Sequence, residues 1–412
     1  MIPTTYGRID KSETGDGHGT TLEGGTDLIA KAYQKNHPSQ LLCLSHISPP
    51  LQMYWRYFIE PPLFGVENPP APKMSWQAFA DGSLTREFEV YLSQRIGFRP
   101  TAVRTVNQVQ MFCGSNNLQD PTKSVAILQG SWLHATGYLT AFSTPSIGSI
   151  SNKTQATIER IARLHHQLRS QGKVLLVVVS PTKAETYPEH VPERFHKKRR
   201  SVGGKRDYEY FVEELAKLNI PHVDSTQIVQ QMRAEGLEPF ARGGVHWNYL
   251  ASMKVWQEVV HCLNKTTNWD LPVPDVLDIT YEVARGTDKD LAQFLNVYVP
   301  PCDGELVPYP VLQASTAKPG SLKCLFVGTS FTLTLISSMQ LARTFDESDF
   351  LYYNKRHFTF DESHPPARAG DLSPATDKGQ DGDKMGQAQH FSTDASRILV
   401  KHVIASVSTG WN

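Results

Sequence analysis

The sequence alternates between short apolar runs and longer segments of helical periodicity, and this alternation limits the possible folds more than any other feature. Apolar runs lie at Val125–Leu128, Val174–Val179 and Leu322–Val327, and another run ends at Asp224. Between them, apolar residues recur every three or four positions, as in Lys153–Ser170. Such alternation favours a mainly parallel sheet with helices on both faces. We therefore predict an α/β fold with a flavodoxin-like sheet.

Composition divides the chain into three parts. Residues 1–73 form a polar and then Pro-rich lead that we expect to be loose or disordered. Residues 74–360 hold the alternating pattern and are the expected main domain. Residues 361–412 read as a polar insertion or tail, in which Ile398–Val407 has the pattern of a last strand or helix.

Charge and cysteine content narrow the class of protein. The chain has 41 Lys plus Arg and 41 Asp plus Glu, which argues against a nucleic-acid partner because such proteins usually carry a basic excess. The cysteines form no C-x-x-C pair, so neither a zinc site nor a redox dithiol is predicted. We expect no metal. The five cysteines are Cys43, Cys113, Cys262, Cys302 and Cys324.

Ser330 follows directly after the most regular apolar run. Leu322–Val327 ends at Gly328, and an amphipathic segment begins near Ser330. This layout of strand, glycine turn and helix puts a serine at the carboxyl edge of a sheet, where open α/β folds place their sites. Ser330 is either a helix N-cap or a nucleophile. In the second case, backbone N–H groups of the Gly328–Thr329 turn and the first helical turn would hold an oxyanion.

His246 lies on a glycine-bearing loop just before a second helical segment. The loop reads Arg-Gly-Gly-Val-His-Trp-Asn over residues 242–248, and Asn248 is a plausible helix cap. Alone, His246 is most simply a packed loop histidine. Together with Ser330 it becomes a candidate general base, because a serine hydroxyl is a weak nucleophile until its proton is removed.

The segments Val245–Asn248 and Gly328–Phe331 together resemble the alginate O-acetyltransferase family, whose members are SGNH-hydrolase-like proteins that acetylate exported polysaccharides. Further blocks match in the family's order, from about residue 75 to about residue 354. They are the Phe79–Arg99 segment, Val125–Tyr138 with Gly130-Ser131-Trp132-Leu133, Val174–Pro188 with Pro181-Thr182-Lys183 and Tyr187-Pro188, and Asp290-Leu291-Ala292.

The resemblance implies an SGNH-like fold and acetyl transfer through an acetyl-serine, with Ser330 and His246 as catalytic residues. It implies no cofactor, since the acetyl donor comes from a partner. Further candidate substrate contacts are Arg242 and Trp247 on the histidine loop and Lys183 in the third block. Tyr353, at a strand end beside Ser330, would either stack on a sugar or pack in the core.

Gly244 departs from the family pattern, which usually has an Asp two residues before the His. That carboxylate fixes the imidazole tautomer, and its loss is costly. Three alternatives follow: a Ser-His dyad, an orienting acid elsewhere (Asp224 or Asp290), or a catalytically silent glycan-binding or scaffold protein. We expect Gly244→Asp to raise activity modestly. Acetyl-ester hydrolysis by the same Ser-His pair is a further alternative.

Location and partners also follow from the resemblance. Members act in the periplasm or cell envelope, on a polysaccharide acceptor and with a membrane-bound O-acyltransferase as a possible partner. No signal peptide is visible, because the first 26 residues are polar and lack an apolar core. The basic run Lys197–Arg200, continued by Lys205-Arg206, is either a solvated loop or a contact for an anionic polysaccharide.

Overall fold

The computed structural model describes residues 60–66, 69–113, 125–143, 152–202, 206–313, 320–352, 356–361, 376–378 and 402–408. It divides into two compact units. The first unit covers Met1–Pro62 and Glu67–Thr101, and the second covers Leu63–Val66 and Ala102–Asn412.

The first unit contains the helices α3 (Trp76–Ala80) and α4 (Ser83–Arg95) and the beginning of α5 (Arg99–Phe112). Ser75 caps α3 by accepting from the Ala78 N–H at 3.1 Å. The Glu60 carboxylate accepts from the backbone N–H groups of Phe98 and Thr101 at 3.0 and 3.1 Å. These contacts close the segment before α3 onto the start of α5. α4 and α5 are separate helices, and the chain changes direction between them at Phe98, which has a positive φ of 61°.

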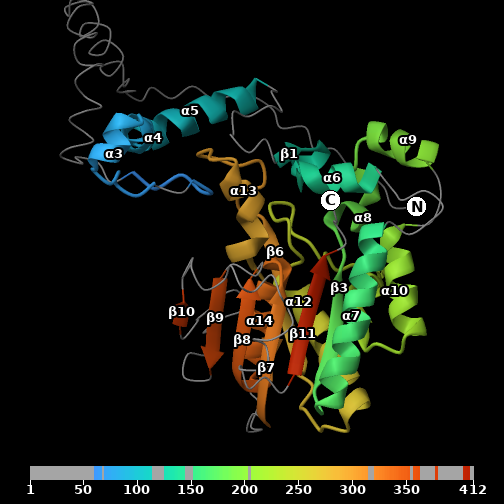
Figure 1. Ribbon diagram of the computed structural model, residues 1–412. Coiled ribbons are helices and arrows are strands. Elements are labelled where there is room, and N and C mark those ends of the chain that lie inside the picture. The colour runs from blue at the N-terminus through green and yellow to red at the C-terminus, as the bar shows by residue number, and fades with distance from the viewer. Residues whose placement is uncertain are drawn as a thin grey trace, which may run out of the picture. The chain divides into compact units, whose positions relative to one another are not determined.

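A seven-stranded sheet forms the centre of the second unit (Figure 1). The strand order is β10-β9-β8-β7-β11-β3-β4 among the described residues. The pairs from β8 to β4 are parallel, whereas β9 runs antiparallel to both β8 and β10. The strands are β3 (Val174–Ser180), β4 (His222–Asp224), β7 (Gly320–Gly328), β8 (Phe345–Tyr352), β9 (Arg356–Asp361), β10 (Thr376–Lys378) and β11 (His402–Ser408).

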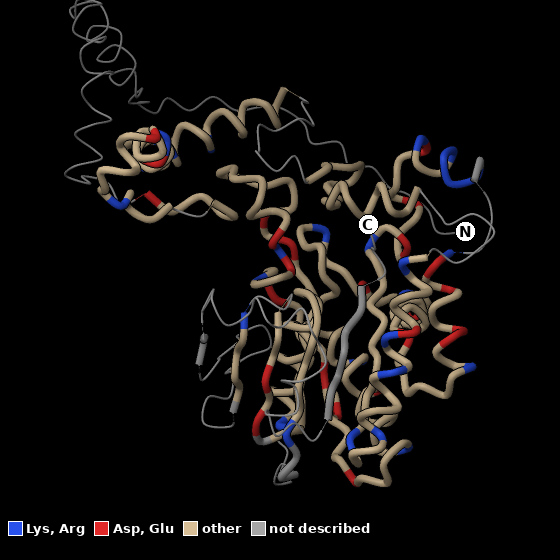
Figure 2. The backbone as a smooth tube through the Cα atoms, viewed as in Figure 1, with Lys and Arg blue, Asp and Glu red and all other residues tan. Residues whose placement is uncertain are grey.

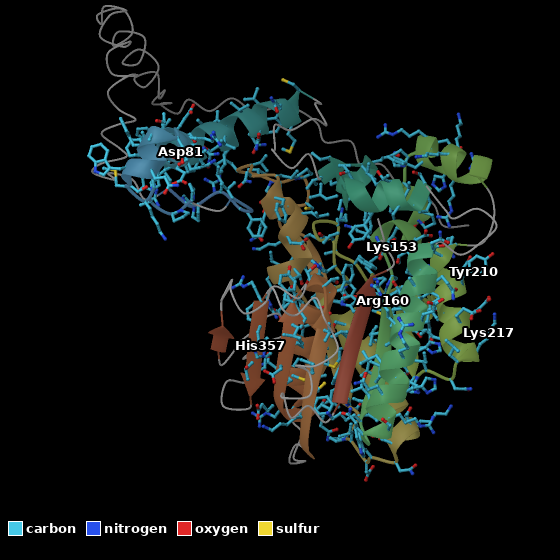
Figure 3. All side chains as sticks on the ribbon, viewed as in Figure 1. Asp81, Lys153, Arg160, Tyr210, Lys217 and His357 are labelled. Atoms are coloured by element: carbon cyan, nitrogen blue, oxygen red, sulfur yellow. The ribbon has the colours of Figure 1, made fainter. Side chains whose placement is uncertain are left out.

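Helices cover both faces of this sheet, and the side chains of β3 show how. Successive residues of a strand point to opposite faces. Leu176 and Val178 join a cluster with α12 (Tyr249–Thr267) and α14 (Ser330–Ala342), whereas Leu175 and Val177 join one with α7 (Asn152–Ser170) and α10 (Asp207–Lys217). An uninterrupted apolar run is what a strand buried on both faces requires. Figure 3 shows Lys153 and Arg160 on α7 and Tyr210 and Lys217 on α10, the two helices of one face.

Two smaller sheets flank the active-site segments. β1 (Val125–Ile127) pairs antiparallel with β2 (Leu133–Ala135), around the short helix η1 (Gln129–Ser131). β5 (Val276–Val283) pairs antiparallel with β6 (Leu306–Leu312), and the connection between them holds η3 (Gly286–Lys289) and α13 (Asp290–Phe294). The sequence pattern did not predict the β5–β6 pair.

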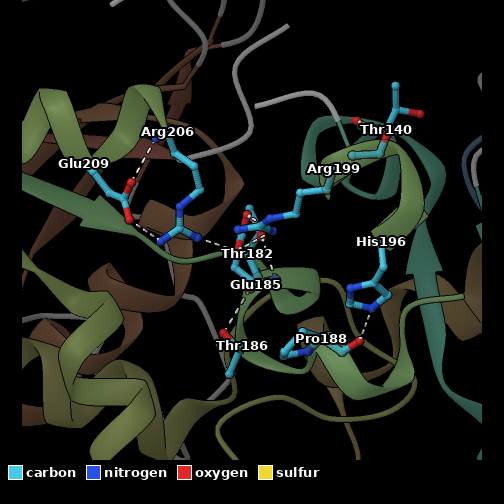
Figure 4. A network of polar contacts seen from close by, with 10 residues as sticks. Thr140, Thr182, Glu185, Thr186, Pro188, His196, Arg199, Arg206 and Glu209 are labelled. Carbon is cyan, nitrogen blue, oxygen red and sulfur yellow. Dashed lines mark hydrogen bonds and ion pairs between the residues drawn. The ribbon is translucent and has the colours of Figure 1, made fainter. Parts of the chain in front are cut away.

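The remaining described helices come between β2 and α12 in the sequence. They are α6 (Thr136–Ser143), α8 (Lys183–Thr186), η2 (Pro188–His190), α9 (Glu193–Val202) and α11 (Ser225–Ala234). The basic run at 197–200, expected in a loop, belongs to α9, where Figure 2 shows Lys and Arg gathered. Arg199 pairs with Glu185 on α8 at 3.0 Å, and Arg206 pairs with the same carboxylate at 2.6 Å (Figure 4). These two arginines therefore anchor α8.

β11 lies at the centre of the sheet although it comes from the polar C-terminal part. It runs parallel to β3 on one side and to β7 on the other. The sequence pattern of this segment was compatible with either a strand or a helix, and the structure has a strand. The expected boundaries at residues 73 and 360 stay a prediction. No helix of the described ranges is long and apolar enough to cross a membrane.

Candidate active site

Ser330 is the first residue of α14, directly after the turn that ends β7. Phe326 in β7 is fully buried, and the strand ends at Gly328. Thr329 is extended (φ −98°, ψ −171°) and occupies the N-cap position without a side-chain capping bond. The N-cap interpretation of Ser330 is therefore wrong, because Thr329 holds that position. The Ser330 hydroxyl instead points to the ring of His246, with 2.7 Å between Oγ and Nε2.

His246 reaches Ser330 from the loop before α12. Asn248 caps that helix by accepting from the Ala251 N–H at 2.9 Å, as the sequence predicted. The His246 side chain is buried, with 5% exposure, and its ring packs on Phe331 at a centroid separation of 4.7 Å. Because Phe331 follows Ser330 on α14, one helix start positions both the nucleophile and a wall for the imidazole.

Asp290 supplies the acid of a complete triad. Its Oδ2 lies 2.7 Å from Nδ1 of His246. Its Oδ1 accepts from the backbone N–H groups of Val245 at 2.9 Å and Leu291 at 2.7 Å. A carboxylate that already accepts two N–H bonds is an acceptor toward the ring. The proton of neutral His246 is thus assigned to Nδ1, which leaves Nε2 free to accept from Ser330.

The two acids proposed from the sequence have different positions. Asp224 lies at the end of the edge strand β4, where Oδ1 caps α11 by accepting from the Thr226 N–H at 3.0 Å. It is not the orienting acid. Asp290, the first residue of α13, is the acid that meets His246.

Gly244 is enclosed by the segment that carries Asp290. A Cβ added there would lie 2.7 Å from the Thr287 carbonyl oxygen and 2.9 Å from that of Asp288. Both contacts are with backbone, so relieving them requires the chain to shift. The usual acid position is therefore closed in this protein because η3 passes against it. The expectation that Gly244→Asp would raise activity does not fit this packing.

Two of the expected substrate contacts are buried away from any substrate. Trp247 has 0% exposure, and its Nε1–H donates to the Thr334 hydroxyl on α14. Lys183 has 2% exposure, and its Nζ lies within 2.9 Å of four backbone carbonyl oxygens, which share its N–H donors. Both residues hold structure beside the site. These two expectations are wrong, because neither polar group is left free.

Arg242 keeps its side chain at the surface, with 47% exposure, and its Nε lies 3.5 Å from Glu305. It stays a candidate for substrate contact. Tyr353 lies outside the described residues, whereas its neighbour Tyr352 packs beside Phe350 and Phe358. Gly328 and Thr329 form the turn before Ser330, as expected.

The residues behind the triad have shifted proton affinities. Burial raises the pKa of Asp288 well above its usual range, although the Tyr309 hydroxyl donates to Oδ2 at 2.9 Å. Burial lowers the pKa of Lys183 to about 7, against the opposing charges of nearby acids. Burial likewise lowers the pKa of His134 to about 3, so this histidine is neutral. Neither Asp288 nor Glu305 belongs to a recognisable motif, so sequence analysis could not identify them.

The geometry allows nucleophilic chemistry of the Ser-His-Asp type. The hydroxyl, imidazole and carboxylate form one chain of hydrogen bonds, in the sequence order His246, Asp290, Ser330. Such triads occur on unrelated folds in different chain orders, so the geometry identifies them. Within the described ranges, no group of three His, Cys, Asp or Glu side chains is arranged to hold a metal ion.

Residues 130–332 match the family model described as "SGNH hydrolase-like domain, acetyltransferase AlgX". No curated protein matches the chain. Among solved structures, the O-acetyltransferase domain of Pseudomonas putida AlgJ is 14% identical, with 70% of this chain and 91% of that chain covered and a TM-score of 0.42.

Two further structures are similar at the same TM-score of 0.42. Pseudomonas aeruginosa AlgX is 13% identical, with 70% of this chain and 63% of that chain covered. Bacillus cereus PatB1, solved with a sulfonyl adduct, is 11% identical, with 69% and 93% covered. The matched segment begins at Gly130 and ends just after Ser330, so it includes every member of the triad. Over residues 130–332 the chain is therefore similar to the AlgX acetyltransferase family of SGNH hydrolase-like domains.

Proposed function

We propose that this protein is an O-acetyltransferase that moves an acetyl group through an acetyl-serine onto a hydroxyl of an exported polysaccharide. The observation that carries the proposal is the pair of 2.7 Å contacts that join Ser330 to His246 and His246 to Asp290. The match of residues 130–332 to an acetyltransferase family model supports the acetyl group as cargo.

In the first half-reaction, Ser330 Oγ attacks the carbonyl carbon of an acetyl donor while His246 Nε2 takes the hydroxyl proton. Asp290 stabilises the imidazolium that forms. In the first turn of α14 the Thr332 N–H already donates to the Thr329 carbonyl at 3.0 Å, so the N–H of Ser330 at the helix start is the donor suited to hold the oxyanion. Collapse breaks the bond to the donor's leaving group, which receives the proton from His246, and acetyl-Ser330 remains.

In the second half-reaction, a sugar hydroxyl attacks the acetyl carbon and gives its proton to His246 Nε2. The bond from the acetyl group to Ser330 Oγ breaks, and Oγ takes the proton back. No cofactor is needed in either step, since the acetyl group arrives on its donor. We assign donor delivery to a membrane-bound O-acyltransferase partner, and we place the protein in the periplasm or cell envelope.

Three measurements test this proposal together. Release of acetate from an aryl acetate ester should need Ser330 and His246, and Ser330→Ala should lower turnover by at least about a thousandfold. A sulfonyl fluoride should label Ser330. An oligosaccharide acceptor should divert acetyl groups from water to sugar, with the acetylated product identified by mass spectrometry.

The outcomes separate the alternatives. Free acetate that does not respond to any acceptor would favour an esterase. No turnover and no labelling of Ser330 would favour a silent glycan-binding or scaffold protein. The catalytically silent alternative was suggested by Gly244, which stands where the family usually has an acid. The contact between Asp290 and His246 counts against it.

A further inference from the structure

The loop that carries His246 has no regular secondary structure, so its backbone polar groups must find partners elsewhere. Residues 241–245 lie between the isolated bridge partners Phe240 and Trp247. The loop is largely buried: Ala241, Gly243 and Gly244 are all in the interior. An unpaired buried carbonyl or amide group would destabilise the fold, because it loses its hydrogen bonds to water without replacement. What holds these groups therefore decides where His246 lies.

Three carbonyl groups of this loop converge on one side chain. The Lys183 Nζ donates to the carbonyl oxygens of Ala241 at 2.7 Å, Arg242 at 2.8 Å and Gly244 at 2.8 Å. It also donates to the Leu133 carbonyl in β2 at 2.9 Å. One buried amino group thus ties the histidine loop to β2 and to α8.

The amide groups of the same loop are held by two carboxylates. Glu305 accepts from the N–H groups of Arg242 at 2.7 Å and Gly243 at 3.2 Å. Asp290 accepts from the Val245 N–H at 2.9 Å. Carbonyl groups therefore face the N–H donors of an amino group, and amide groups face the acceptor oxygens of two carboxylates.

The base of Lys183 is itself fixed. Thr182 caps α8 by accepting from the Glu185 N–H at 3.2 Å, and the Glu185 carboxylate is held by Arg199 and Arg206 (Figure 4). The Lys183 Nζ also lies 5.0 Å from the centre of the Trp132 ring, a cation–π contact. Lys183 therefore projects from a rigid base to the loop.

We propose that Lys183 and Glu305 are positioning residues that set the place and orientation of His246 by clamping the backbone of residues 241–244 between an amino group and a carboxylate. This inference rests on the proposed role of His246 as the general base. Neither residue contacts Ser330 or the ring of His246 in the hydrogen bonds of the site. They act through the chain two to five residues before the histidine.

The test variant is Lys183→Met, which keeps most of the side-chain length and removes the donors. Lys217→Met is the matched control, because Lys217 lies exposed on α10 with its Nζ paired only to Glu214 at 2.6 Å (Figure 3). Loss of the clamp should lower kcat for an aryl acetate by about tenfold to a hundredfold, the cost of a misplacement near 1 Å, with little change in KM. Glu305→Gln, which retains one acceptor oxygen, should lie between wild type and Lys183→Met.

A spectroscopic measurement reads the position of His246 without relying on turnover. In protein labelled with ¹⁵N-histidine, His246→Gln identifies the His246 signals among the 15 histidines. The Nδ1 proton should be resolved far downfield in wild type and Lys217→Met, because Asp290 accepts it in a buried bond. In Lys183→Met and Glu305→Gln it should be shifted or broadened by exchange, at temperatures where each variant remains folded.

Unchanged His246 signals in both folded variants would overturn the proposal, whatever the enzyme turns over. If wild type shows no Ser330-dependent reaction while the variants still shift the His246 signals, the clamp stands and the proposed function fails. If Lys183→Met does not fold, the His246 signals of Glu305→Gln alone decide whether the proposal stands. A kcat that falls with His246 signals identical to wild type would also count against the clamp.

Discussion

At the scale of single residues, the site depends on where each polar atom finds its partner. Asp290 donates no proton in the proposed chemistry, but its two oxygens fix both the ring of His246 and the backbone next to it. An acid from a different segment thus replaces the one that the family usually carries in the histidine loop. In the proposed chemistry Asp290 takes the role of that Asp from a different position in the sequence.

Asp290→Asn should lower kcat by about a hundredfold to ten-thousandfold, because an amide facing Nδ1 favours the wrong tautomer of His246. Aryl acetate turnover measures this effect. Asp224→Asn is the matched control and should leave kcat unchanged, since Asp224 only caps α11. Equal losses in the two variants would contradict the assignment of Asp290.

Gly244→Asp should lower both activity and stability, because its Cβ would meet the carbonyl oxygens of Thr287 and Asp288. Overpacking of this kind costs about 1–3 kcal/mol. Urea unfolding and turnover are the measurements. Gly137→Asp, at a position with nothing within 4 Å of an added Cβ, should be tolerated. A Gly244→Asp enzyme that is faster and equally stable would show that η3 moves aside.

Asp288→Asn should change how stability depends on pH. The folded-state pKa of Asp288 is raised above 3.8, so the folded protein keeps a proton that the unfolded chain releases. Stability from this group is therefore lost as pH rises from about 4 upward, by at most about 1.4 kcal/mol per pH unit. The variant lacks this loss, so the difference between its unfolding free energy and that of wild type should move in the variant's favour as pH rises above about 4. Parallel pH profiles would contradict a buried, protonated Asp288.

At the scale of elements, the candidate active site lies where three separate segments of the chain meet. The β7–α14 turn supplies Ser330, the loop before α12 supplies His246, and the β5–β6 connection supplies Asp290. α12 and α14 pack against each other, so the two segments that carry His246 and Ser330 share one core. The distance from Ser330 to His246 therefore depends on that packing.

Trp247→Phe tests this coupling. The Trp247 indole N–H donates to Thr334 on α14, and its ring packs edge-on to Phe331 at 5.5 Å. Loss of the buried bond should lower the free energy of unfolding by about 1–3 kcal/mol. KM for an oligosaccharide acceptor should stay within about twofold, since a fully buried ring does not meet substrate. Trp76→Phe, at a side chain with 88% exposure, is the control. A large rise in acceptor KM would restore Trp247 as a substrate contact.

At the scale of the whole molecule, the sheet depends on a strand from the far end of the chain. β11 pairs with β3 and β7, which are separated in sequence by the loop of His246 and the segment of Asp290. The strand order thus brings together parts of the chain more than two hundred residues apart. Closure of the sheet requires the C-terminal segment to fold with the rest.

Ala405→Pro should prevent stable folding, because position 405 pairs with Val177 and Val327 on both sides of a central strand. Proline removes a ladder hydrogen bond and is tolerated in sheets mainly at edges. Asp377→Pro in the edge strand β10 is the matched control and should cost far less. Circular dichroism and urea unfolding compare the two. A cooperative Ala405→Pro variant of normal stability would show that β11 is not part of the essential sheet.

The sequence by itself determined the elements whose signals are local. Apolar runs specified β3 and β7, periodicity specified α7 and α12, and the glycine turn before Ser330 and the cap at Asn248 followed from short-range chemistry. These features depend on neighbours a few residues away, so one sequence is enough to read them. The pairing of Ser330 with His246 was also predicted from such local patterns, because they resemble those of the family.

Only the tertiary structure decided which acid meets His246, why Gly244 carries no side chain, and that Trp247 and Lys183 are buried. Each of these depends on contacts across 40 residues or more, as in the 44-residue separation of His246 and Asp290. No periodicity encodes such contacts. They arise because burial leaves few partners for each polar group, and chain topology selects which partner is within reach.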